Sequence, residues 1–197
     1  MKIFAISVVR NNVKPAKTIV DEKDLASFSY FQRSSIGEFM TFMSQTIAEK
    51  TQPGQRQSIE ESNYVGHVYG RSEGVAGVVI TDKEYPPRVA FSLLNKILDE
   101  FTTKYPNSAL WSNPGQCPYP ELKQYIVTYQ DPKQGDTIMK VQRELDETKI
   151  ILHKTIESVL ERGEKMESLV ERSDVLSSQS KMFYKTAKKQ NACCVIC

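Results

Sequence analysis

The chain has 197 residues and carries 26 Lys and Arg against 24 Asp and Glu, so it is long enough for one or two domains and too balanced in charge to favour a nucleic-acid partner. Apolar residues make up 40% of the chain, and the fraction is the same if the nine Gly are counted in place of the nine Tyr. This is below the roughly 45–50% usual for globular domains, so part of the chain is not expected to build its own core. No apolar run reaches the roughly 18 residues of a membrane span, and the N-terminus is too alternating for a signal peptide, so we expect a cytosolic protein.

Residues 1–131 are predicted to form an α+β domain, with helices packed on the faces of an antiparallel sheet. Alternating or β-branched runs predict strands at residues 2–9, 17–20, 64–69 and 75–81. Ser34 and Ser35 offer an N-cap to a first helix, whose apolar face is formed by Ile36, Met40, Met43 and Ile47. A second helix is expected after Pro86 and Pro87, and a short third helix is expected to end near Tyr129.

Beyond a linker predicted at residues 132–136, a heptad repeat predicts a long coiled-coil helix over residues 137–190. This segment contains no Pro and a single Gly. Apolar residues recur in alternating steps of three and four at Ile138, Val141, Leu145, Leu152, Val159, Met166, Leu169, Leu176, Phe183 and Ala187. A repeat that keeps its register for so long indicates a supercoiled helix, whereas a surface helix of the first domain would not need it.

This predicted helix needs something to pack against. Its ten apolar seam residues contribute at most roughly 15–30 kcal/mol when fully buried, whereas ordering the backbone of the segment costs on the order of 50–100 kcal/mol. A single helix buries little of its seam. We therefore expect the isolated segment to be largely unfolded.

Arg162 indicates what kind of partner covers the seam, because it occupies a seam position between Val159 and Met166. A buried guanidinium costs several kcal/mol unless it is hydrogen-bonded, and a homomeric bundle would place several of them in one layer. A heteromeric bundle whose other helices offer neutral acceptors, such as Gln amides, would satisfy Arg162 and set the register. The alternative is an arginine that snorkels out of a two-stranded coiled coil. The neighbouring Gly163 weakens a helix by about 1 kcal/mol relative to Ala, and the heptad pattern offers no reason for it.

The run LERGEKM (residues 160–166) resembles the core of an R-SNARE motif. The segments SFSYFQRSS, EFMTF, PGQRQS and EYPPRVAFSLLNKILDEF are similar to a longin domain. Together with the C-terminus, the whole chain resembles the prenylated longin R-SNAREs, which lack a transmembrane anchor. The resemblance implies a profilin-like sheet of five strands between one helix and two. It also implies that Arg162 supplies the ionic layer of a four-helix bundle, opposite three Gln residues of Q-SNARE helices, in vesicle fusion at Golgi, endosomal or vacuolar membranes.

The tail, residues 191–197, carries a predicted lipid anchor. Cys194 to Cys197 match the prenylation pattern Cys-aliphatic-aliphatic-X. The same letters form a Cys-x-x-Cys pair, but the chain ends without a helix to lower a thiol pKa, and neither His67 nor His153 lies at a zinc-ligand spacing from it. The final Cys is outside the commonest prenylation choices, so farnesyl and geranylgeranyl both stay open.

Cys193 offers a second lipidation site, usually palmitoyl in the family. One lipid gives marginal attachment and two give stable anchoring. Lysines before it, each worth about 1 kcal/mol near an anionic surface, add to the anchor: Lys181, Lys185, Lys188 and Lys189.

Phe39 and Phe42 lie beside the apolar face of the first helix and are the predicted docking site for the SNARE segment and its lipid in a closed form. The alternative is that both are core residues. Fusion through a bundle with three Q-SNARE helices is the leading functional hypothesis, and a prenylated adaptor or tether is the alternative. The chain contains no GxxxxGK[ST], GxGxxG, HExxH or GxSxG string, so we expect no enzyme, no metal site and no cofactor besides the covalent lipids.

Overall fold

The computed structural model of the protein describes residues 1–113, 115–131 and 150–192, with residues 187–192 described through their backbone alone. Its strands are β1 (Ile3–Arg10), β2 (Lys17–Lys23), β3 (Arg56–Glu61), β4 (Tyr64–Gly70), β5 (Val75–Asp82) and β6 (Ile150–His153). Its helices are α1 (Tyr30–Glu49), α2 (Pro87–Lys104), η1 (Ser108–Ser112), α3 (Glu121–Thr128), η3 (Ile156–Val159), α6 (Met166–Arg172) and α7 (Ser178–Ala192). Among these residues, no helix combines the length and the apolar character needed to cross a bilayer.

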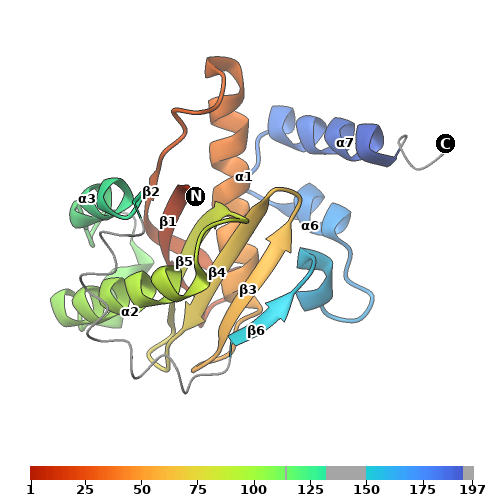
Figure 1. The fold of residues 1–197 in the computed structure, drawn as a ribbon. Coiled ribbons are helices and arrows are strands. Elements are labelled where there is room, and N and C mark those ends of the chain that lie inside the picture. The colour runs from red at the N-terminus through yellow and green to blue at the C-terminus, as the bar shows by residue number, and fades with distance from the viewer. Residues whose placement is uncertain (114, 132–149, 193–197) are drawn as a thin grey trace.

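The strands form one sheet in the order β2-β1-β5-β4-β3-β6. The five strands β1 to β5 pair antiparallel, which confirms the predicted sheet of the N-terminal domain. The helix α1 covers one face, and α2 and α3 cover the other (Figure 1). The sixth strand, β6, was not predicted. It comes from the segment expected to be a coiled coil, and it pairs parallel to β3, with Arg56 opposite Ile150 and Ile59 opposite His153.

The long helix predicted for residues 137–190 is not the structure of this segment where it is described. From residue 150 onward the chain forms β6, η3, α6 and α7. Of these, β6 lies beside β3, and α7 contacts α1 and lies across its direction (Figure 1). The physical reason follows from the need for a partner. The segment buries apolar residues against the N-terminal domain, which covers part of its apolar surface. Ile138, Val141 and Leu145 of the seam, and the linker 132–136, lie outside the described residues.

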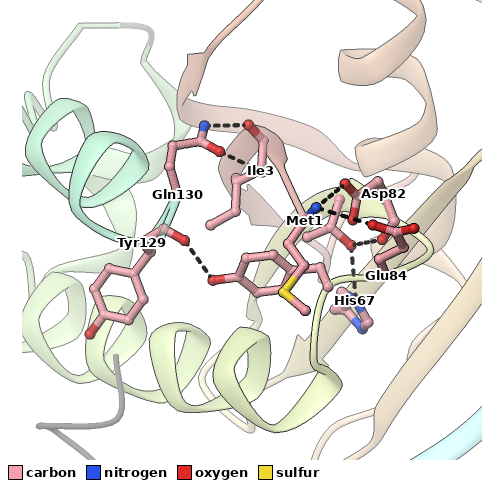
Figure 2. A network of polar contacts seen from close by, with 9 residues as sticks. Met1, Ile3, His67, Asp82, Glu84, Tyr129 and Gln130 are labelled. Atoms are coloured by element: carbon pink, nitrogen blue, oxygen red, sulfur yellow. Dashed lines mark hydrogen bonds and ion pairs between the residues drawn. The ribbon is translucent and has the colours of Figure 1, made fainter. Parts of the chain in front are cut away.

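The last residues of the N-terminal domain are tied to its first strand. The Gln130 side chain accepts a hydrogen bond from the Ile3 backbone N–H at 3.0 Å and donates one to the Ile3 carbonyl at 2.7 Å (Figure 2). The Tyr85 hydroxyl donates to the Tyr129 carbonyl at 2.9 Å. These bonds close the domain just before residue 132 and hold α3 against the sheet.

His67 on β4 is a buried neutral histidine. Its side chain is 1% exposed, and burial lowers its pKa to about 4. The Thr81 hydroxyl donates to the Asp82 carbonyl, so its oxygen accepts from His67 Nε2–H at 3.2 Å. His67 Nδ1 is then left to accept from the Ser58 hydroxyl at 2.8 Å. Both ring nitrogens are thus hydrogen-bonded in the uncharged form, and burial disfavours the charged one.

We therefore expect His67 to lower the stability of the fold as the pH falls from 6.5 to about 4. In that window the unfolded state binds a proton that the folded state does not, and the loss reaches about 3 kcal/mol below pH 4. Urea unfolding of wild type and His67→Gln at several pH values measures this. The difference between the two free energies of unfolding, taken at each pH, isolates the contribution of His67 from that of carboxylates that titrate in the same pH range. Parallel pH profiles for both proteins would contradict the expectation.

Candidate functional site

The surface that receives the C-terminal segment is built on α1 and on the strand β3. Met40, Met43 and Ile47 are at most 3% exposed and pack on the sheet. Phe39 is half-buried, and its ring stacks on that of Tyr184 of α7 with centroids 5.9 Å apart. Of the predicted docking residues, Phe39 thus contacts the segment directly. Phe42 is 5% exposed and belongs to the core cluster that the segment completes.

Four apolar side chains of the segment enter this cluster: Ile156, Met166, Val170 and Leu176, each at most 5% exposed. Two of them, Met166 and Leu176, are predicted seam residues. The other seam residues differ in burial: Val159 and Leu169 are half-buried, whereas Leu152 and Phe183 are 74% and 46% exposed.

Ile156 and Val170 were missed as functional residues by the sequence analysis. Each lies one position after a residue of the seven-residue repeat, so neither belongs to the seam. The signal was present as apolar residues just beside the stripe.

Polar contacts fix the segment at several places along the surface. On the strand side, His153 Nε2 donates to Gln57 Oε1 at 2.8 Å. Near the middle, Lys50 Nζ lies 2.7 Å from Glu164 Oε2 and 3.3 Å from Glu161 Oε1. At the start of α7, Glu38 Oε2 accepts from the Ser177 backbone N–H at 2.8 Å. Each contact joins the N-terminal domain to a different part of the C-terminal segment.

The pKa values of the ionisable groups at these contacts shift in the direction that stabilises their charged forms, which favours docking. Partial burial by itself lowers the pKa of Lys50, but the hydrogen bonds and charges of Glu164 and Glu161 outweigh it and raise the pKa overall. The hydrogen bond from Lys50 lowers the pKa of Glu164. For Glu38, burial raises the pKa, but hydrogen bonds chiefly from Ser177 and Ser180 outweigh it and lower the pKa overall. The docking contribution of both carboxylates is thus present above pH 4.5 and is lost as the pH falls through their lowered folded values.

Breaking the Lys50–Glu164 pair is expected to weaken docking. The Lys50 side chain is 9% exposed and that of Glu164 is 22% exposed, so a double-mutant cycle of Lys50→Met with Glu164→Gln should give a coupling of about 1 kcal/mol. Amide hydrogen exchange in α6 measures the opening free energy. The matched cycle with Glu161→Gln should give only a few tenths of a kcal/mol, because Glu161 is 68% exposed. Equal couplings for the two glutamates would contradict the assignment.

The predicted ionic-layer residue does not take part in docking. Arg162 is exposed, in the turn between η3 and α6. Lys181 and Lys185 of the predicted membrane-facing set contact Glu171 instead, at its carbonyl and carboxylate respectively. The side chains of Lys188, Lys189 and Ala187, and the lipidation candidates Cys193 and Cys194, lie outside the described residues.

A cavity of about 560 Å³ opens between α1 and α7. Its walls are mostly apolar and come from both partners of the docking contact: Phe28, Ile36, Phe39, Met40, Phe183 and Tyr184. Its size falls within the roughly 300–1,000 Å³ of small-ligand sites. The cavity is formed jointly by the N-terminal domain and the C-terminal segment.

Two family models match the chain along most of its length. One, for the longin or regulated-SNARE-like domain, matches residues 25–126, and the other, synaptobrevin, matches residues 137–195. The chain is a longin-domain R-SNARE. It is similar to the synaptobrevin homolog ykt6 of Schizosaccharomyces pombe (61% identical over 196 residues) and to the synaptobrevin homolog YKT6 of Saccharomyces cerevisiae (56% over 200 residues). Both alignments cover the whole of each chain.

Membership in this family confirms a trafficking protein rather than an enzyme. The synaptobrevin segment implies pairing with other SNARE helices. The surface on α1 and β3 is therefore where an R-SNARE motif lies against its own longin domain. The predicted ionic-layer residue, Arg162, points to solvent in this closed form.

Proposed function

We propose that this R-SNARE drives vesicle-membrane fusion by forming a four-helix bundle with three Q-SNARE helices, and that its longin domain restrains it in the closed form. The observation that carries this proposal is the burial of Met166 and Leu176 against the longin domain. Both are seam residues of the predicted bundle. One side chain cannot fill both positions, so docking and bundle formation exclude each other.

The closed form buries only part of the seam, through Met166 and Leu176. Partner helices that cover the whole seam bury more apolar surface, so their binding shifts the population toward the open form.

We further propose that Cys194 carries an isoprenoid and Cys193 a second, reversible lipid, which place the protein on the cytosolic face of Golgi, endosomal or vacuolar membranes. In water an isoprenoid is unfavourable by about 0.8 kcal/mol per CH₂. The cavity between α1 and α7 offers it an apolar site, and Phe183 and Tyr184 of its wall belong to the helix that leads to Cys194. The closed form then keeps the seam residues Met166 and Leu176, together with the lipid, out of water.

Reconstituted vesicles test this function. Vesicles carrying the lipidated protein are mixed with vesicles carrying three Q-SNARE helices, and mixing of their contents is measured. We expect mixing with the lipidated protein and none with Cys194→Ser. A homodimer that holds vesicles together without mixing their contents would support the tether and overturn the fusion proposal. Intact-mass measurement of the protein from its own cells reports which lipids are attached.

A further inference from the structure

Gly163, beside the predicted ionic-layer residue, adopts a backbone conformation that a helix does not allow. Its φ is +89°. The Glu164 backbone N–H donates to the Glu161 carbonyl at 2.9 Å, which closes a turn with Arg162 and Gly163 as its central residues. A positive φ at the third position of such a turn is the signature of type II, which requires Gly or Asn there. The closed form thus depends on the residue type at position 163.

This turn also brings together the two carboxylates that bind Lys50. Glu164 Oε2 accepts from the Glu161 backbone N–H at 3.1 Å and lies 2.7 Å from Lys50 Nζ. Glu161 Oε1 lies 3.3 Å from the same nitrogen. In an α-helix, Gly163 has a negative φ and the Glu164 backbone N–H donates to the carbonyl of residue 160, so the turn belongs to the closed form alone.

We propose that Gly163 is a switch residue that biases the SNARE motif toward the closed form through its backbone alone. This proposal rests on the proposed restraint by the longin domain, and it assigns a role to the single glycine of residues 137–190. In the closed form, Gly163 allows the positive φ of the turn. An ordinary L-residue there would lower the population of the turn about tenfold. In the bundle, Gly163 disfavours the helix about fivefold relative to Ala. Both effects act in the same direction.

The space around Gly163 makes this proposal testable by substitution. A Cβ atom built on Gly163 meets nothing within 4 Å, so a small side chain there creates no clash. Gly115, in the longin domain, provides a matched control. It has a φ of +84° and equally open surroundings, but it lies outside the SNARE motif.

The experiment compares four full-length proteins: wild type, Gly163→Ala, Gly163→Asn and Gly115→Ala. Hydrogen exchange over residues 150–172 measures opening, and titration with three Q-SNARE helices measures bundle formation. We expect Gly163→Ala to raise the opening constant about tenfold and the bundle association constant about fiftyfold. Gly163→Asn should change both less than about threefold, because Asn tolerates positive φ and is a poor helix former. Gly115→Ala should leave bundle formation as in wild type. The hydrogen exchange of residues 150–172, compared with the exchange of the sheet in the same protein, should also be as in wild type.

The outcomes separate this proposal from the closed form itself. If residues 150–172 of the wild type exchange as fast as an unstructured peptide, the restraint by the longin domain is wrong. If they are protected and Gly163→Ala changes neither measurement, the restraint stands and the switch role of Gly163 is wrong. Equal effects of Ala and Asn would also overturn it, because backbone conformation would then not be the cause.

Discussion

Phe42→Glu is expected to release residues 150–192 from the longin domain and to increase both membrane attachment and bundle formation. Phe42 is 5% exposed, in the cluster that also contains Met166 and Val170. A carboxylate there would be buried without a partner, which costs several kcal/mol. Undocking lets the carboxylate reach water. Protease sensitivity of the linker 132–136 and the membrane-bound fraction after fractionation measure the release.

A second substitution separates release of the segment from damage to the longin domain. Phe42 is also part of the domain's own core, so Phe42→Glu is compared with Val170→Glu, which changes only the docked segment. Val170 is 1% exposed here but lies off the predicted seam, so the substitution leaves the bundle positions intact. We expect both variants to open the protein. If Val170→Glu stays closed while Phe42→Glu opens, the effect of Phe42 reflects unfolding of the longin domain.

The strands and helices of the longin domain were predictable where their buried residues are apolar. The strands at residues 2–9, 64–69 and 75–81, and the face of α1, follow hydrophobic patterns that the structure keeps. The strand β3 was missed because two of its three buried residues, Gln57 and Ser58, are polar. Their partners, such as His67 for Ser58, come from elsewhere in the chain. A hydrophobic pattern therefore does not identify a polar residue that is buried because its hydrogen-bond partner lies elsewhere in the chain.

The C-terminal segment shows a different limit, because its sequence serves two structures. The heptad repeat indicated that the segment needs a partner, and docking on the longin domain was predicted at Phe39 and Phe42. The division of the docked segment into β6, η3, α6 and α7 was not predicted. Docking uses Ile156 and Val170 beside the seam and a turn at Gly163, which a search for one continuous helix treats as exceptions. Such local departures from the repeat were the available signal for a second conformation.

Arg162→Asp is expected to abolish bundle formation with three Q-SNARE helices while leaving the closed form intact. In the proposed bundle, Arg162 donates to three Gln acceptors, and an aspartate there would be a buried charge facing groups it cannot satisfy, a loss of about 3–5 kcal/mol. In the closed form Arg162 is exposed, so the change in folding stability should stay within about 0.5 kcal/mol. Titration with the Q-SNARE helices measures the first effect, and hydrogen exchange over residues 150–172 measures the second.

Arg162→Gln removes the positive charge without introducing the negative charge of Arg162→Asp, so the two variants separate these effects. A glutamine amide both donates and accepts, so it can join a layer of Gln residues, and this variant should bind the Q-SNARE helices more tightly than Arg162→Asp. Since Arg162 touches solvent in the closed form and only partner helices in the bundle, its substitutions report on the open form alone. A chain that formed equally stable homodimers with Arg or Gln at position 162 would contradict a heteromeric layer, because facing guanidinium groups would then carry no penalty.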